Sequence, residues 1–330
     1  MKLTYRSIRA RAARAGLHAP VAWFRHFGLD SSDVLLASHG RSGSTLLRFI
    51  LAEILSGEPS TFDNIQQISP EMGLQGRARP IVPGGGRLIK THEPYRREYK
   101  RAIYMVRDVR DTMLSGFARE TAVDCIHTDL DSYVRPFMQG KMSHYGSYQV
   151  HVDSWLNSPL AKSGDLLVLR FEDMVKDLED SVARCVEFIG APVELSVIRS
   201  AIQNNTLEKM RAKEDQAKKL PKVKGEEGRQ VGRGRIGGWR EKLTERQLEI
   251  VDEYAGETLA RLGYPSGLSS SSSERKQTEV IQQQSVFSNI RIRRPRTSIA
   301  GSLAQASAER RALRVRVGGE IANLFCWYQY

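Results

Sequence analysis

The chain has 330 residues, 40% of them hydrophobic and 27% charged, which is enough for one large α/β domain with a buried core or for two small domains. Its net charge of +12 is gathered in the two ends, about +5 in residues 1–32 and about +6 in residues 266–330, so the middle is near neutral and we expect no nucleic-acid partner. The three cysteines lack metal-ligand spacing, no apolar run has the roughly 18 to 20 residues that span a bilayer, and no secretory signal is evident, which predicts a cytoplasmic protein with reduced thiols.

The first predicted elements are a helix, a strand and a second helix. Residues 1–29 have the pattern of a basic, alanine-rich amphipathic helix. Residues 33–37 (DVLLA) form a short apolar run that predicts a buried strand. A turn rich in glycine and serine leads into a helix over residues 44–55, where apolar residues recur at helical spacing. Residues 57–86 are rich in proline and glycine and predict a long loop.

Three further apolar runs predict strands at residues 88–90, 102–106 and 166–170, and helical patterns fall at residues 109–119, 145–157, 177–189 and 244–262. Strands that alternate with helices predict a single α/β domain with a central, mostly parallel, doubly wound sheet flanked by helices.

The composition changes after Pro265, where serine, glutamine and arginine become frequent. We therefore predict a basic N-terminal helical segment over residues 1–32, one domain over residues 33–265 and a disordered tail over residues 266–330, in which residues 302–315 could form a short helix. The basic ends could be solvated tails or could dock on an anionic lipid surface, which leaves a peripheral membrane contact open. The oligomeric state is not predicted.

The turn SHGRSGST at residues 38–45 joins the first strand to its helix. Such a turn points backbone N–H groups and the positive end of a helix at one place. Gly43 lets the backbone approach an anion closely, Arg41 adds a planar guanidinium suited to phosphate or sulfate oxygens, and Ser44 and Thr45 add hydroxyl donors. An ordinary capped turn is the alternative. The triphosphatase P-loop is not matched, because no lysine precedes Ser44.

Two further clusters follow later strands. Lys90 and His92 lie two residues apart at the end of the second strand, which puts both side chains on one side, at the edge where parallel sheets bind ligands. A histidine can remove an acceptor proton, and a lysine can stabilise charge on a leaving oxygen. Arg107 at the end of the third strand and Ser115 on the next helix offer a second phosphate site. A solvated lysine, a hydrogen-bonded loop histidine and a capped helix are the alternatives.

In this order, the three clusters resemble the sulfotransferases that use 3′-phosphoadenosine 5′-phosphosulfate (PAPS), in their soluble bacterial and cytosolic form, over about residues 33–265. The resemblance implies a P-loop-like sulfotransferase fold. It implies transfer of a sulfuryl group from PAPS to a hydroxyl or amine acceptor, such as a glycan, glycolipid or small molecule, with PAP as product and no metal. A P-loop-like kinase or nucleotide hydrolase and a non-catalytic nucleotide-binding protein on the same fold stay as alternatives.

The resemblance assigns roles residue by residue. SHGRSGSTL at residues 38–46 is similar to the family's 5′-phosphosulfate loop, Lys90 and His92 to its catalytic pair, and GRGRIGGW at residues 232–239 to the loop that closes over the 3′-phosphate. The catalytic residues implied are His92, Lys90 and Arg41, and the cofactor-binding residues are Arg41, Ser42, Gly43, Ser44, Thr45, Leu46, Arg107, Ser115, Thr206, Arg233 and Gly234.

The chain also departs from the family pattern. Leu46 and Leu207 stand where members often stack adenine on aromatic rings, so aromatic stacking is not expected here. Phe171 replaces a frequent tyrosine, and Gly232 replaces the first basic residue of the closing loop. We interpret the other histidines as structural or solvent-facing and Trp155 as a packing residue. The acidic residues Asp108, Asp111, Glu172 and Asp173 are interpreted as helix caps and ion pairs. The acceptor pocket is expected from residues 57–86 and 119–145.

Overall fold

The computed structural model describes residue 23 and residues 25–123, 126–143, 145–218, 220 and 226–268. The helices and strands named below all belong to the compact unit that spans His26–Ile292. Most of the basic segment predicted over residues 1–32, and most of the tail predicted over residues 266–330 with its helix near residues 302–315, lie outside the described residues. The boundaries of the domain predicted over residues 33–265 stay a prediction.

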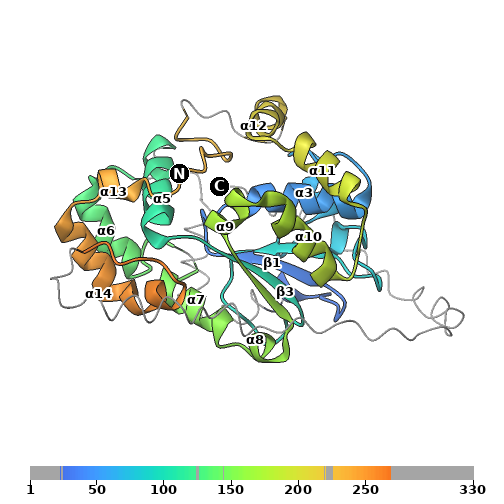
Figure 1. Ribbon diagram of the computed structural model, residues 1–330, viewed down its shortest axis with the longest axis horizontal. Helices are drawn as coiled ribbons and strands as arrows, with labels where there is room; N and C mark the ends of the chain where they lie inside the picture. The colour runs from blue at the N-terminus through green and yellow to red at the C-terminus, as the bar shows by residue number, and fades with distance from the viewer. Residues whose placement is uncertain are drawn as a thin grey trace, which may run out of the picture. The chain divides into compact units, whose positions relative to one another are not determined.

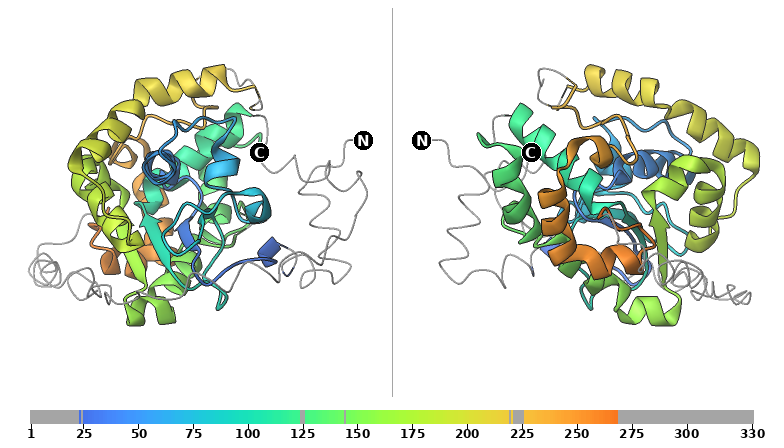
Figure 2. Two further views of the ribbon diagram at one scale, coloured as in Figure 1. Left: turned by 90° about the vertical axis from the view of Figure 1, so that its right-hand side faces the viewer. Right: turned by 60° about the vertical axis from the view of Figure 1, so that its left-hand side comes forward.

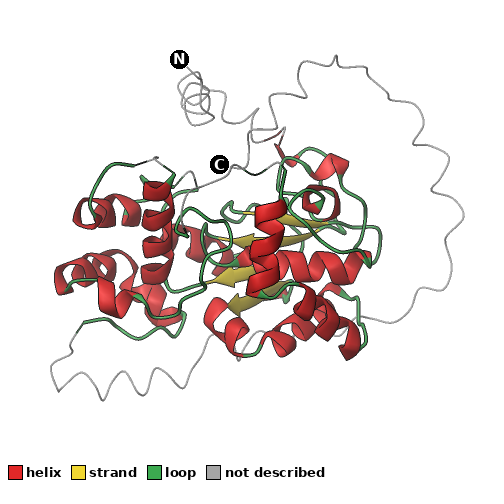
Figure 3. Cartoon of the chain, turned by 90° about the horizontal axis from the view of Figure 1, so that it is seen from above, coloured by secondary structure: helices red, strands yellow, loops and turns green. Residues whose placement is uncertain are grey.

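Four parallel strands form the central sheet (Figure 3), and each lies where an apolar run predicts it. They are β1 (Val34–Ser38), β2 (Leu88–Thr91), β3 (Ala102–Val106) and β4 (Leu166–Arg170), hydrogen-bonded in the order β2-β1-β3-β4. Nearly every strand residue is buried, because helices cover both faces of a parallel sheet. The predicted α/β fold with a mostly parallel sheet flanked by helices is confirmed.

Alternate strand residues point to opposite faces of the sheet and build two separate cores. Val34 and Leu36 belong to the core of one face, and Leu35 and Ala37 to the core of the other. The first face is covered by α3 (Ser44–Ser56), α10 (Leu178–Ile189) and α11 (Leu195–Asn204), which lie to the right in Figure 1. The second face is covered by α5 (Val109–Ala122), α6 (Leu130–Met138), α7 (Tyr148–Leu156) and α14 (Glu245–Arg261).

Helices also occur in segments that we predict as loops or leave unassigned. Besides α6 and α11, these are α4 (Ile65–Ile68), the 3₁₀ turn η1 (Gln75–Arg77), α8 (Pro159–Ser163), α9 (Phe171–Lys176), α12 (Leu207–Gln216) and α13 (Trp239–Lys242). The short helix α6 contains Pro136, which ordinarily breaks a helix, and it begins at the cap Asp129. The helix predicted over residues 145–157 begins only at Tyr148, because Gly146 has a φ of 84° and cannot continue a right-handed helix.

The strand order fixes where a ligand can bind. The chain leaves β1 to form β2 on one side of it and then returns to form β3 on the other, so the order reverses at β1. In open parallel sheets the crevice outside the carboxyl ends of the strands at such a reversal is the usual ligand site. The turn at residues 38–45 and the residues after β3 lie at this edge. Within the described residues no helix is long and apolar enough to cross a membrane.

Candidate active site

The turn after β1 has the backbone geometry of an anion-binding loop. Gly43 is left-handed, with a φ of 87°, and no described side chain caps the start of α3 at Ser44, so the first N–H groups of the helix stay available. A Cβ at position 43 would lie 2.4 Å from the ring of Phe171, so only glycine fits. Arg41 is also left-handed, with a φ of 66°, a conformation that is uncommon outside glycine and that clusters at functional sites.

Arg41 lies beside the residues predicted to hold the 3′-phosphate. Its Nε donates to Ser115 Oγ at 3.1 Å, and Arg107 Nη1 donates to the Arg41 carbonyl at 3.2 Å. Burial, together with the charges of Arg119 and Arg107, lowers the pKa of Arg41 to about 10. Several guanidinium groups brought together under partial burial favour an anion at this place.

Arg107 and Ser42 have polar atoms that the described residues leave unpaired. Arg107 Nη2 donates to the Arg235 carbonyl at 2.7 Å, and the guanidinium lies 4.6 Å from the centroid of the Phe171 ring. Arg107 Nε and Ser42 Oγ are buried without a hydrogen-bond partner among the described residues. Buried donors of this kind ordinarily have a partner. The unpaired donors therefore fit a phosphorylated or sulfated group at this edge.

The closing loop predicted at residues 232–239 and the residues before it are held at two places by carboxylates. Glu214 of α12 accepts the N–H groups of Gln230 and Val231 at 2.6 and 3.0 Å. Asp111 of α5 accepts those of Gly237 and Trp239 at 2.6 and 3.1 Å. Figure 2 shows α12, in yellow, beside the loop, in orange.

The closing loop reaches the turn after β1. A Cβ at Gly232 would lie 3.8 Å from Arg41 Nη2, and one at Gly234 would lie 3.6 Å from the ring of Phe171. The side chain of Arg233 is half exposed, and its Nε lies 3.6 Å from Glu226. Gly232 and Gly234 therefore lie close to Arg41 and Arg107, which precede them by more than a hundred residues.

His92 is oriented by the neighbouring strand. Its Nδ1 lies 2.8 Å from the Ser38 carbonyl, which can only accept, so Nδ1 carries the proton and Nε2 keeps its lone pair. Burial and the charge of Lys90 lower the pKa of His92 to about 3, so the ring stays neutral. The His92 carbonyl accepts from His151 Nε2 at 3.1 Å, and Tyr104 donates to His151 Nδ1 at 2.9 Å. The fully buried His151 thus fixes the backbone that presents His92.

Lys90 is paired with a residue that the sequence pattern does not single out. Its Nζ lies 3.5 Å from Glu71 Oε1, and Arg48 Nη1 donates to the same oxygen at 3.3 Å. Glu71 comes from the segment predicted as a loop, which has no periodicity to mark it. Arg48 does carry a signal, because it follows Ser44 by one turn on the buried face of α3, where a charged residue is unusual.

Thr206, predicted to bind the cofactor, precedes α12, whose first residue is Leu207, and Leu46 lies on α3. Thr206 caps α12, and its Oγ1 accepts the N–H of Lys209 at 3.4 Å, which leaves the hydroxyl proton available. Leu46 packs between two of the hydrophobic clusters, and Leu207 is 46% exposed. The structure thus gives Thr206 a capping role that the sequence reasoning missed.

Asp108 and Trp155 have the contacts expected of structural residues, whereas Asp111, interpreted as a helix cap or ion pair, accepts N–H groups of the closing loop instead. Asp108 caps α5 by accepting the N–H of Arg110 at 2.9 Å, and Glu172 accepts the N–H of Asp108 at 3.0 Å. Trp155 is buried, and its Nε1 donates to the Glu93 carbonyl at 3.1 Å. Among the described residues, no group of three or more histidine, cysteine, aspartate or glutamate side chains could hold a metal ion.

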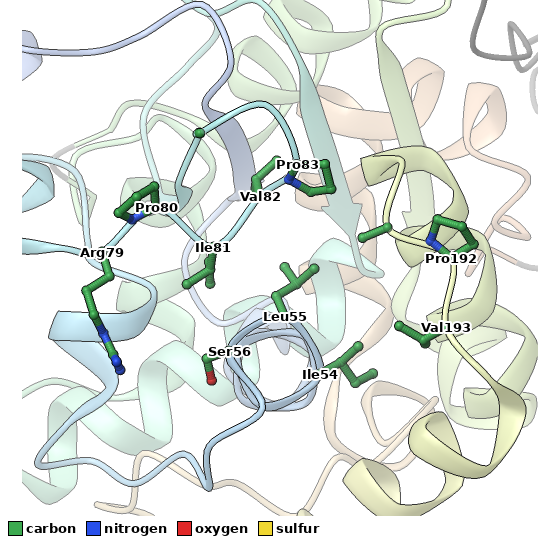
Figure 4. Close-up of a pocket in the computed structure, with 12 residues that line it drawn as sticks. Ile54, Leu55, Ser56, Arg79, Pro80, Ile81, Val82, Pro83, Pro192 and Val193 are labelled. Carbon is green, nitrogen blue, oxygen red and sulfur yellow. The ribbon is translucent and has the colours of Figure 1, made fainter. Parts of the chain in front are cut away.

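An open hollow of about 600 Å³ lies at the other end of α3 (Figure 4). The last turn of the helix, at Ile54, Leu55 and Ser56, faces residues 79–83 on one side and Pro192 and Val193 on the other. None of the predicted donor or catalytic residues lines it. We therefore assign it no part in the donor site.

Comparison with known proteins gives a consistent result. The profile of the sulfotransferase domain matches residues 31–263. Sulfotransferase 2A2 of Mus musculus is 27% identical over 267 residues, which cover 73% of this chain and 88% of the relative. The 3-alpha-hydroxysteroid sulfotransferase of Cavia porcellus is 28% identical over 258 residues, with the same two coverages of 73% and 88%.

Solved structures are similar in fold. Retinol dehydratase in complex with androsterone and the inactive cofactor PAP aligns with a TM-score of 0.57 at 19% identity, covering 72% of this chain and 83% of that one. Mouse sulfotransferase SULT7A1 complexed with PAP aligns with a TM-score of 0.57 at 21% identity, covering 80% and 94%. These alignments support the predicted P-loop-like α/β fold.

Proposed function

The chain belongs to the sulfotransferase family, and we propose that it transfers a sulfuryl group from PAPS to the hydroxyl group of an acceptor and releases PAP. The observation that carries this proposal is the meeting of three distant segments at one sheet edge. The turn after β1 with Arg41, the end of β2 with Lys90 and His92, and the end of β3 with Arg107 all lie there. This is the arrangement that the resemblance to the family implies for donor binding and catalysis.

We assign donor binding to two sets of groups. The backbone N–H groups of residues 42–45, with Arg41, would hold the 5′-phosphosulfate, since they point from a helix start at one place. Arg107, Ser115, Arg233 and the N–H of Gly234 would hold the 3′-phosphate. The unpaired Arg107 Nε supports this second assignment. When bound, PAPS supplies an activated sulfuryl group with PAP as its leaving group.

His92 is the proposed general base. Its Nδ1 is held by the Ser38 carbonyl, so Nε2 can accept the proton of the acceptor hydroxyl. The lowered pKa of His92 keeps the ring neutral at neutral pH, so Nε2 offers an unprotonated lone pair. Lys90 and Arg41 would stabilise the charge that develops on the leaving and equatorial oxygens. Positioning and electrostatics therefore supply most of the acceleration.

For the acceptor we propose an apolar alcohol as the first class to test. The names of similar proteins support this class. One relative is a 3-alpha-hydroxysteroid sulfotransferase, and retinol dehydratase, which is similar in fold, has been solved with androsterone and with retinol. The ring of Tyr145 lies 6.0 Å from that of His92, which places an aromatic surface beside the proposed base. Phenols, glycans, glycolipids and amines form the other groups of the acceptor panel.

Two measurements test the proposal. In calorimetry, PAP should bind without magnesium and ATP should bind poorly. With radiolabelled PAPS, the full chain should transfer label to at least one alcohol of the panel. Magnesium-dependent ATP binding with no response to PAP would favour the kinase alternative, and PAP binding without transfer to any acceptor would favour a non-catalytic binding protein.

We also propose a cytoplasmic location, supported by the sparse cysteines. A peripheral membrane contact through the basic ends is compatible with this location. Liposome co-sedimentation of the full chain and of a chain that lacks residues 1–30 measures it. Equal binding of both to anionic vesicles would remove the N-terminal segment from that role.

A further inference from the structure

Glu71 lies between two cations at the end of β2. Its Oε1 is 3.5 Å from Lys90 Nζ and 3.3 Å from Arg48 Nη1. The side chains of Arg48 and Lys90 are 4% and 10% exposed, and that of Glu71 is 28% exposed. The carboxylate thus joins a buried arginine of α3 to the lysine proposed to act in catalysis.

The surroundings of Glu71 fix its position from several directions. The segment around it runs beside β2, since Lys90 donates its N–H to the Pro70 carbonyl at 2.8 Å and accepts that of Met72 at 2.8 Å. Arg48 Nε donates to the Ser69 carbonyl at 2.9 Å.

Gln66 adds a further anchor. Its Oε1 accepts the Glu71 N–H at 2.9 Å and a proton of Arg48 Nη2 at 3.2 Å. Backbone and side-chain bonds therefore hold the carboxylate in one place.

Such a site is more than an ordinary surface ion pair. An exposed pair contributes about 0 to 1 kcal/mol to stability, and the chain would need no buried arginine to form one. Here Arg48 reaches across from α3 with its guanidinium shared between the Ser69 carbonyl, Gln66 and Glu71. The same Glu71 oxygen that faces Arg48 also faces Lys90, so the arginine orients the carboxylate toward the lysine.

We propose that Glu71, oriented by Arg48, is a positioning residue that holds the Lys90 ammonium group in place for sulfuryl transfer. This inference rests on the proposed function, in which Lys90 stabilises the leaving oxygen. Glu71 acts through Lys90 and touches no reacting atom. Its removal should therefore affect turnover more than donor binding.

The charges around Lys90 predict a second effect. Burial lowers the pKa of Lys90, Glu71 raises it, and Arg48 and Arg41 lower it. For His92, burial and Lys90 lower the pKa, the Ser38 carbonyl and Glu71 raise it, and His39 lowers it.

Glutamine at position 71 would remove a charge that keeps the proton on Lys90, so Lys90 would lose that proton at a lower pH. The loss of the same charge would lower the pKa of His92 further. Both limbs of the pH profile of activity should move to lower pH.

The test uses the full chain with the Glu71→Gln substitution. We expect kcat to fall about 10- to 100-fold, as for other groups that orient a functional side chain, with the KM for PAPS changed less than about threefold. The alkaline limb of kcat should move to lower pH. Glu71→Asp should recover part of kcat and of the alkaline limb, because it keeps the charge.

Glu179→Gln is the matched control. It makes the same change on α10, outside the segments expected to form the acceptor pocket, where Glu179 pairs with Arg199 at 2.8 Å and both side chains reach solvent. It should leave kcat and the pH profile unchanged.

The outcomes separate this inference from the proposed function. Wild-type turnover and pH limbs in Glu71→Gln, with Lys90→Met inactive, would overturn the inference alone. An active Lys90→Met would remove the role of Lys90 and the inference with it, and absence of PAPS-dependent transfer by the wild-type chain would overturn both. If Glu71→Gln and Glu71→Asp both unfold, with low melting temperatures and no PAP binding, Glu71 is a structural residue and the inference is wrong.

Discussion

The carboxyl edge of the sheet and the closing loop both border the proposed donor site, but different interactions hold them in place. The edge residues follow buried strands, and the turn at residues 38–45 is fixed between β1 and α3. The closing loop and the residues before it have no regular secondary structure over residues 226–238, and their position depends on the carboxylates of Glu214 and Asp111.

This difference has a functional meaning. The sheet edge carries Lys90 and His92, whose proposed roles in catalysis need fixed geometry, and many backbone bonds supply it. Under the proposed function the loop lets a large donor enter and leave, and it is held by a few side-chain bonds that can break one at a time. We therefore expect substitutions at the edge to change turnover and substitutions at the loop anchors to change donor affinity.

The largest effect should come from His92→Ala at the sheet edge. Loss of a general base lowers kcat by about 10²- to 10⁴-fold, while PAP affinity should stay close to that of the wild type, because the donor-binding groups remain. Single-turnover transfer from labelled PAPS and calorimetry with PAP measure the two quantities. Glu257→Ala, at an exposed position of α14, is the control. Unchanged turnover in His92→Ala would remove His92 from the role of base.

Lowering the pH should destabilise the fold through the buried histidines near the sheet edge. Burial lowers the pKa of His39 to about 4 and that of His92 to about 3, and it lowers that of His151 as well. Below about pH 6.5 the unfolded chain binds protons that the folded chain does not, so stability is full above that pH and falls below it, by up to about 1.4 kcal/mol per pH unit for each histidine.

Urea unfolding between pH 7.5 and 5 checks this expectation. The midpoint should fall as the pH is lowered. A midpoint that stays constant over this range would contradict the neutral state of the three buried histidines.

Asp111→Asn tests the closing loop. The substitution removes the charge that holds the N–H groups of Gly237 and Trp239, and a bond to a charged group contributes about 1.5 to 3 kcal/mol. Part of that free energy serves to close the loop over the donor, so we expect the KM for PAPS to rise about tenfold with kcat nearly constant. Steady-state kinetics measure both, with the exposed Asp252→Asn on α14 as control. A fall in kcat at constant KM would mean that the loop acts on the chemical step instead.

Thr206→Ala should have the smallest effect. Loss of the cap of α12 should cost about 1 kcal/mol of stability. The resemblance to the family also implies that Thr206 binds the cofactor, so PAP affinity should fall about two- to tenfold, which corresponds to one neutral hydrogen bond. Thr206→Ser should restore both. Lost stability with unchanged PAP affinity would leave Thr206 as a helix cap only.

The sheet and its edge could be predicted from the sequence because they follow from local patterns. The four strands are buried apolar runs, and parallel pairing brings Arg41, Lys90, His92 and Arg107 to one edge without further information. The pairing of Glu71 with Lys90 could not be predicted, since it depends on how residues 70–72 lie beside β2. The bonds of Glu214 and Asp111 to the closing loop could not be predicted either. Both carboxylates accept backbone N–H groups, which every residue except proline carries, so the sequence does not indicate the partner. The helix α6 was missed because Pro136 interrupts its pattern.

The ring of Phe171 touches three parts of the proposed donor site that come from distant regions of the chain. It contacts Gly43 in the first turn, supports the guanidinium of Arg107 and faces Gly234 of the closing loop. Residues that share one packing partner rarely change independently, so the effects of substitutions at these three positions will not add. If the closing loop of a relative replaced this one, it would have to pack against the ring of Phe171. The residue at position 171 and the sequence of the loop would therefore have to be changed together.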